Sequence, residues 1–156
     1  MGRSSESGFT YLELVATAII LAIVASAVLP VARVSYRRTR ELELHRALRQ
    51  MRAAIDQYRA LVQQGRIGGT DLKLGSEGCP SDLETLVKGV NQVGSAGPKL
   101  KFLRRIPTDP MTRTTDWGLR CYQDDSDTTS WCGQNVWDVY SKSEEKGLDG
   151  SPYKEW

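Results

Sequence analysis

A single carboxylate, Glu13, lies at the start of a long apolar stretch, SESGFTYLELVATAIILAIVASAVLPVARVSYRR. From Leu14 to Ala32 the chain has 19 residues without a charge, and its polar side chains are Thr17 and Ser26. A carboxylate in or beside a membrane segment is costly unless it finds a partner. Glu13 is therefore suited to pairing with a cation, whereas a side chain that merely reaches headgroup water is the simpler alternative.

The cysteines are the second group of residues with chemistry of their own: Cys79, Cys121 and Cys132. Cys121 and Cys132 lie on or beside two stretches of strand-like composition, which predicts a loop-closing disulfide in an oxidising compartment. Cys79 would then be free or bonded to another chain, and other pairings stay open. A zinc site is disfavoured, because three cysteines and the single histidine, His45, lack ligand spacing.

Enzymatic chemistry is disfavoured as well. His45 belongs to a polar helical stretch and is expected to be solvated there. The sequence contains no nucleophile motif, no phosphate-binding loop and no pair of carboxylates that can be placed in a pocket. We therefore expect a protein that is not an enzyme.

A long helix is expected to position Glu13. The uncharged run would form a helix roughly 28 Å long at about 1.5 Å per residue, close to the hydrocarbon thickness of a bilayer. Pro30 lies within it and predicts a kink, because proline removes one backbone hydrogen bond. Beyond Pro30 the apolar residues follow spacings of three and four, which predicts an amphipathic continuation. This stripe consists of Leu44, Leu48, Met51, Ile55, Tyr58 and Val62. We expect one helix from about Phe9 to Gln64, with Gly65 ending it.

The remainder of the chain predicts a small α+β body. Ser81 and Glu84 form a capping box for a short helix from Asp82 to about Val90. Two stretches with aromatic and β-branched residues, Asp116 to Gln123 and Asn135 to Ser141, predict an antiparallel strand pair.

Charge is segregated along the chain, whose net charge is +2. Between Arg33 and Arg59 eight arginines face three acids, whereas between Pro107 and Trp156 ten acids face five bases. Such asymmetry can recruit nucleic acid or lipid, and it can equally let the basic helix of one copy meet the acidic body of another.

The residues Gly8-Phe9-Thr10-Tyr11-Leu12-Glu13, with the apolar stretch after them, resemble the processing site of type IV prepilins and type II secretion prepseudopilins. In that family a membrane peptidase cuts after the glycine and methylates the new N-terminal residue. The resemblance implies cleavage between Gly8 and Phe9, N-methylation of Phe9, and Glu13 as the fifth residue of the mature chain. It also places Pro30 where the family often has a helix-disrupting proline.

The body resembles the G-type major pseudopilins in particular. The segment Phe102 to Pro110 is similar to the one before their sheet, and Trp117-Gly118 and Val136 to Ser141 are similar to their strands. The resemblance implies a pilin-like α+β fold, in which a long N-terminal helix packs on a small C-terminal antiparallel sheet. It divides the chain into a leader (1–8), a membrane and filament-core helix (9–32), an amphipathic stem helix (33–64) and a globular periplasmic head (65–156).

The resemblance implies a structural subunit of a type II secretion pseudopilus, a helical filament that helps drive protein export across the outer membrane. A main-shaft type IV pilin of a surface pilus is the alternative, and a single-pass anchored binding module is a third class. In the family, the residue corresponding to Glu13 is thought to pair with the N-terminal amine of the next subunit and so to set the filament register. A minor subunit at the tip would typically lack it.

The implied partners are other copies of the chain, minor pseudopilins, the prepilin peptidase, the inner-membrane assembly platform with its ATPase, and membrane lipid before assembly. No nucleic acid is expected, because a filament would cover the basic stem. G-type pseudopilins bind Ca²⁺ in the loop after the last strand, which implies a site at Ser143, Glu144 and Asp149. Lys142 and Lys146 oppose such binding.

The implied location is the bacterial inner membrane, with the N-terminus cytoplasmic and the head periplasmic. The arginines that follow the apolar run outnumber Arg3 before it, so the positive-inside rule predicts the opposite orientation. We give precedence to the cleavage site, because it must face the cytoplasmic peptidase.

Overall fold

A computed structural model describes residues 9–68, 75–94, 97–125 and 127–156. Its elements are helix α1 (Tyr11–Gln63), helix α2 (Leu83–Lys88), strands β1 (Gly118–Arg120) and β2 (Asp138–Tyr140), and the 3-10 helix η2 (Tyr153–Glu155). The chain divides into two compact units, Met1–Thr39 and Arg40–Trp156. The expectation of one long N-terminal helix and a small C-terminal antiparallel sheet is confirmed, and the predicted leader lies outside the described residues.

Helix α1 begins and ends with recognisable local signals. The Thr10 hydroxyl oxygen accepts a hydrogen bond from the Glu13 N–H (3.3 Å), as an N-cap side chain does. At the other end, Gly65 adopts a positive φ of 68°, and the Gly65 and Arg66 N–H groups donate to the carbonyls of Val62 and Leu61. This is the Schellman pattern, so the predicted stop at Gly65 is confirmed.

The first half of α1 has the composition of a membrane span. Among the described residues, α1 is long and apolar enough to cross a membrane by its length and composition. The hydroxyls of Thr17 and Ser26 donate to the carbonyls of Leu14 and Ile23 at 2.9 and 2.7 Å. The helix backbone thus satisfies both polar side chains of the uncharged run, which an apolar surrounding requires.

The second half of α1 supplies the core of the head. The predicted stripe of apolar residues is confirmed, because Leu44, Leu48, Met51, Ile55 and Tyr58 are all buried and Val62 is half-buried. Each of these side chains contributes about 1.5–3 kcal/mol of hydrophobic stabilisation when fully buried. They pack in one cluster with residues from every later element, including Leu86, Leu103, Trp117, Val139 and Tyr153.

Helix α2 begins one residue later than the capping-box pattern predicts. The N-cap is Asp82 rather than Ser81, because the Asp82 carboxylate accepts from the Thr85 N–H at 2.7 Å. Glu84 does not reach back to the N-cap and instead pairs with Lys88 one turn on. The helix ends at Gly89, where φ is 80° and an added Cβ would lie 2.7 Å from the Leu100 carbonyl oxygen.

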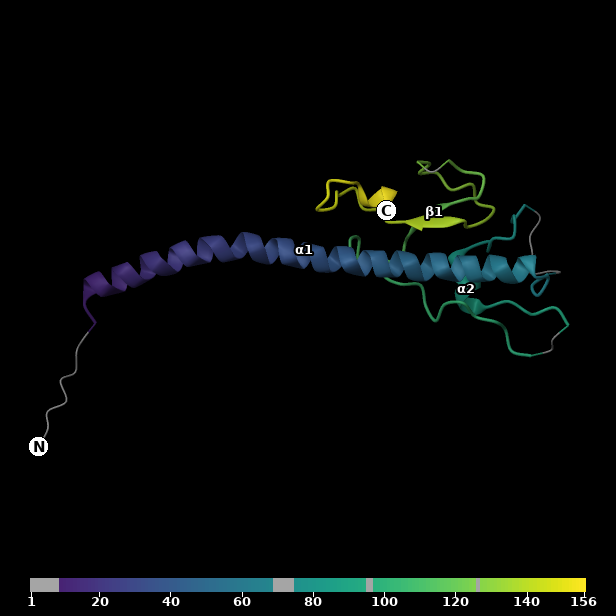
Figure 1. The fold of residues 1–156 in the computed structure, drawn as a ribbon, viewed down its shortest axis with the longest axis horizontal. Helices are drawn as coiled ribbons and strands as arrows, with labels where there is room; N and C mark the ends of the chain where they lie inside the picture. Colours follow the sequence, from purple (N-terminus) through teal and green to yellow (C-terminus); the bar gives the residue numbers. More distant parts are fainter. Residues whose placement is uncertain (1–8, 69–74, 95–96, 126) are drawn as a thin grey trace, which may run out of the picture. The chain divides into compact units, whose positions relative to one another are not determined.

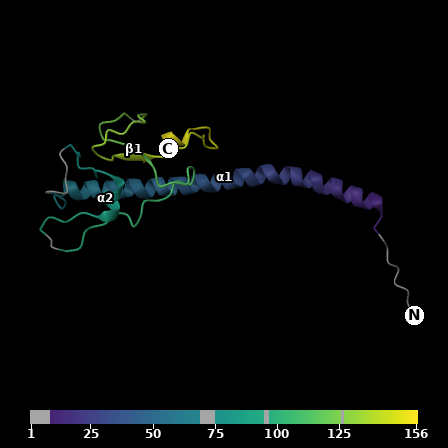
Figure 2. The ribbon, with the colours of Figure 1, turned by 180° about the vertical axis from the view of Figure 1, so that it is seen from behind.

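Strands β1 and β2 form the predicted antiparallel pair, with Gly118 opposite Tyr140 and Arg120 opposite Asp138. Each strand has three residues, so both are shorter than the predicted stretches. An added Cβ at Gly118 would lie 2.2 Å from the Tyr140 ring, so any other residue there would force the ring to move. The pair lies on one side of the second half of α1 and α2 on the other (Figure 1), and Figure 2 shows the same arrangement from behind.

A buried carboxylate links the segment before the sheet to the end of β2. Asp109 is fully buried and accepts hydrogen bonds from the Ser141 hydroxyl (2.6 Å) and the Met111 N–H (2.7 Å). The Trp117 indole N–H donates to the Pro107 carbonyl at 2.9 Å. These bonds hold the irregular 107–117 segment against the sheet.

Candidate functional site

The first turn of α1 presents a carboxylate next to exposed apolar side chains. Glu13 is exposed, and Phe9, Tyr11 and Leu12 are 75%, 84% and 79% exposed. A negative charge in the first helical turn is favourable, because the helix dipole places partial positive charge there. Phe9 and Glu13 are four residues apart, about one helical turn. The predicted cut between Gly8 and Phe9 stays a prediction, because Gly8 lies outside the described residues.

The apolar surface continues along the first unit. Several large apolar side chains of this unit are more than half exposed, among them Ile20, Leu21 and Ile23. Soluble monomers rarely leave so much contiguous apolar surface uncovered, so this surface is suited to lipid or to other apolar helices. Helix α1 runs through Pro30 without interruption, and the predicted kink there stays a prediction.

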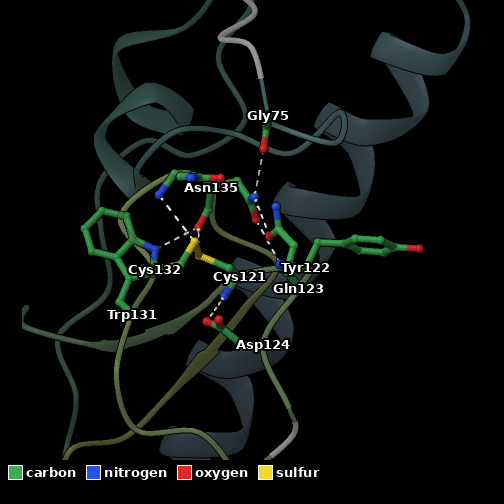
Figure 3. Close-up of a disulfide and its surroundings, with 9 residues drawn as sticks. Gly75, Cys121, Tyr122, Gln123, Asp124, Trp131, Cys132 and Asn135 are labelled. Carbon is green, nitrogen blue, oxygen red and sulfur yellow. Dashed lines mark hydrogen bonds between the residues drawn. A yellow bond between two sulfur atoms is a disulfide. The ribbon is translucent and has the colours of Figure 1, made fainter.

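The predicted disulfide between Cys121 and Cys132 is present and closes the loop that follows β1 (Figure 3). The two Cα atoms are 6.0 Å apart, and the loop closes over a sequence separation of 11. The Cys121 N–H donates to the Asp124 carboxylate at 2.7 Å, which folds the chain back at the start of the loop. We call residues Cys121 to Cys132 the disulfide loop.

Asn135 holds this loop through several hydrogen bonds, and its sequence surroundings gave no indication of that role. Its side chain is fully buried; its oxygen accepts from the Tyr122 N–H (2.9 Å), and its nitrogen donates to Gln123 (3.0 Å) and to the Gly75 carbonyl (3.2 Å). Its backbone oxygen accepts from the Trp131 indole at 2.7 Å (Figure 3). Asn135 therefore holds both ends of the disulfide loop: its side chain binds Tyr122 and Gln123, and its backbone oxygen binds Trp131.

Aromatic side chains stay partly exposed around the disulfide loop. Tyr122, Trp131 and Trp137 are 50%, 40% and 39% exposed. The guanidinium of Arg59, from α1, lies 4.0 Å from the Trp137 ring centre and 5.6 Å from that of Tyr122. Such cation–π contacts stabilise by about 0.5–1 kcal/mol when exposed. The rings of Tyr122 and Trp137 thus contact one arginine from α1 within the same chain.

Cys79 is a buried thiol that is not bonded to another cysteine of this chain. Burial raises the pKa of Cys79, the acids Glu77 and Asp56 raise it further, and the cationic Arg59 lowers it. A thiol with a raised pKa remains protonated at neutral pH and is a poor nucleophile. Cys79 therefore fills space in the core and does not offer reactive chemistry.

The disulfide between Cys121 and Cys132 limits the metal binding of the head. Among the described residues, metal-ligating side chains come together at Cys121, Asp124 and Cys132. The two sulfurs are bonded to each other, so neither offers a thiolate.

The loop implied to bind Ca²⁺ offers hard oxygen donors without bringing them to one point. Ser143 and Glu144 line a cavity of about 450 Å³ whose wall also contains Lys142 and Lys154. Asp149 is not part of that wall; its carboxylate accepts from the Ser151 N–H (2.9 Å) and hydroxyl (2.7 Å), which lowers the pKa of Asp149. The donor set as it stands fits Ca²⁺ poorly, because two ammonium groups share the cavity with one carboxylate. Calorimetric titration of the chain with Ca²⁺ tests this prediction.

The segment after β2 is anchored on α1 by a buried carboxylate. Glu41 is 9% exposed, and one of its oxygens accepts from the Leu148 N–H (2.8 Å) and from the Tyr153 hydroxyl (2.9 Å). Tyr153 itself is fully buried. The segment from Gly147 to Trp156, which we call the tail, is therefore part of the folded head.

Two more residues of α1 hold the tail. Arg52 forms an ion pair with Asp138 (2.7 Å) and donates to the backbone oxygen of Trp156 (2.7 Å). The His45 ring, predicted to be a solvated side chain, is exposed but stacks on the Trp156 ring with 4.4 Å between centres. Glu41, His45 and Arg52 are separated by four and seven residues, so they share one helix face.

Comparisons with protein-family models, with curated proteins and with solved structures gave no match. The residues and geometry described above are therefore the basis for assigning a function.

Proposed function

We propose that this chain is a structural subunit of a helical filament of the type IV pilin-like class, and within that class a type II secretion pseudopilin. The observation that supports it best is the first half of α1, where exposed apolar side chains surround the lone carboxylate Glu13. The resemblance of residues 8–13 to a prepilin processing site gives this helix its family context.

Before assembly the apolar half of α1 spans the inner membrane, and after assembly copies of the same helix cover one another. Burying apolar surface stabilises by about 25 cal/mol per Å², so helices of this length can hold a polymer without covalent links. Contacts that join one patch to a different patch on the next copy do not close, and they generate an open fibre.

Glu13 provides the register in this scheme. Cleavage after Gly8 creates a free amine on Phe9, and in apolar surroundings the carboxylate and this amine must find partners. Pairing between neighbouring copies neutralises both charges and fixes the axial step. The partners of the assembly are other copies of the chain, minor subunits, the peptidase and the membrane assembly platform.

The test is the Glu13→Ala variant, with Glu43→Ala as its matched control. Glu43 is an exposed glutamate on the second half of the same helix. We expect Glu13→Ala to reduce filament yield at least tenfold and Glu43→Ala to leave it unchanged. Normal filament yield from Glu13→Ala would remove the proposed register role.

Two further measurements separate the alternatives. Mass spectrometry of the native chain should find a methylated N-terminus at Phe9, and an intact leader would point to an anchored binding module instead. A reporter enzyme fused after Trp156 should be active in the periplasm. Filaments that extend from the cell and support adhesion, motility or DNA uptake would assign the chain to surface pili.

A further inference from the structure

The part of α1 from Val31 to Arg38 carries an apolar groove, and the cationic side chain of Arg38 lies at one end of it. The groove is lined by Val31, Val34, Ser35 and Arg38, which follow the spacing of one helix face. Val31 and Val34 are 70% and 53% exposed, and Arg38 is exposed. We call these four residues the arginine face. An apolar groove beside a guanidinium is suited to an aromatic side chain with a carboxylate next to it.

The disulfide loop has the complementary chemistry. Asp124, Asp125 and Asp127 lie within it, and residues 121–137 contain no lysine or arginine. Asp125 and Asp127 are exposed, and Trp131 is 40% exposed. The disulfide and the Asn135 contact hold Trp131 at the end of the loop, so presenting this ring costs little conformational entropy on binding.

We propose that the arginine face of one copy docks on the disulfide loop of a second copy, with Arg38 paired with the carboxylates of Asp125 and Asp127 and Trp131 in the groove of Val31 and Val34. This inference rests on the proposed filament, and it names a contact that joins neighbouring subunits where the apolar helix passes into the amphipathic helix. Arg59 already shows the same chemistry within the head, where a helix-borne guanidinium covers Trp137 and Tyr122.

Charge reversal with rescue tests the contact in the full-length chain in native membranes. Arg38→Glu and the double variant Asp125→Lys/Asp127→Lys should each reduce filament yield about tenfold, because each places like charges opposite one another. A chain that carries all three changes should recover most of the yield, because the contact then has its charges exchanged. The yield of the unaltered chain should fall as salt is raised, since exposed ion pairs are screened.

Matched controls separate this contact from a general effect of charge. Arg46→Glu and the double variant Glu43→Lys/Glu155→Lys alter exposed groups of the same charges elsewhere in the second unit. We expect their yields to stay within twofold of the unaltered chain. The unfolding midpoint of every variant is measured too, so that lost yield is not mistaken for lost folding.

The proposal is overturned if the combined variant assembles as poorly as Arg38→Glu alone. That result would assign Arg38 to anionic lipid headgroups, whose attraction the loop substitutions cannot restore. Equal losses from the control variants would overturn it as well. The two proposals can fail separately. If Glu13→Ala blocks assembly but the loop substitutions do not rescue Arg38→Glu, the filament proposal is retained and the docking contact is rejected.

Discussion

Replacing Glu41 by alanine should detach the tail from α1 and destabilise the head. One carboxylate oxygen accepts from the Leu148 N–H and from the Tyr153 hydroxyl at 2.8 and 2.9 Å. Hydrogen bonds to a charged group contribute about 1.5–3 kcal/mol each. Leu148 is 45% exposed, so its amide can regain a water partner, whereas Tyr153 is fully buried and its hydroxyl cannot. We therefore expect a loss of about 3 kcal/mol for Glu41→Ala.

Urea unfolding of the full-length chain in detergent measures this loss, and hydrogen exchange localises it. The Leu148 amide should exchange faster in Glu41→Ala, while amides in the centre of α1 respond only to the change in global stability. Glu41→Gln keeps an acceptor oxygen and should lose about half as much stability. Glu43→Ala removes an exposed glutamate from the same helix and should change the free energy of unfolding by less than about 0.5 kcal/mol.

Two results would refute this reasoning. The first is a Glu41→Ala chain that unfolds at the same urea concentration as the parent. The second is unchanged exchange at Leu148 despite lower stability, because the tail would then be held by Arg52 and His45 without help from the carboxylate.

The remaining predictions concern the strand pair β1–β2 and the disulfide loop. Replacing Cys121 and Cys132 by serine should lower the free energy of unfolding by about 3 kcal/mol, because the loop closes over a separation of 11 residues. Urea melts of the double variant should match those of the reduced parent, and a midpoint equal to that of the oxidised parent would contradict the estimate. Gly118→Ala should lose about 2 kcal/mol, because the added methyl group meets the Tyr140 ring. Circular dichroism and urea melts check it, and a strand pair of unchanged stability would show that the ring can move aside.

Sequence periodicity was sufficient for the elements that depend on local pattern. The apolar stripe from Leu44 to Tyr58 predicted the buried face of α1, because spacings of three and four place residues on one side of a helix. Glycine chemistry predicted the end of α1 at Gly65. The position of the strand pair followed from composition, but its length did not, since strand ends depend on which residues find a ladder partner.

The sequence did not predict features that depend on exact geometry or on contacts between distant parts of the chain. Ser81 and Asp82 are both competent N-caps, so only the geometry at Thr85 decides in favour of Asp82. Glu41 and Leu148 are more than a hundred residues apart, and no periodic pattern marks their contact. Asn135 resembles any strand-start asparagine until its buried partners are known.

The position of Cys79 in the core couples thiol oxidation to the order of folding. Cys79 precedes the other two cysteines in the chain, so during synthesis it is the first thiol exposed and the nearest wrong partner for Cys121. Once the core closes around it, its protonated sulfur is withdrawn from exchange. A polypeptide oxidised before it collapses has three cysteines available to pair, whereas one that collapses first has a single pairing left to make. Burial of Cys79 therefore protects the Cys121–Cys132 bond from exchange with the third thiol once the head has folded.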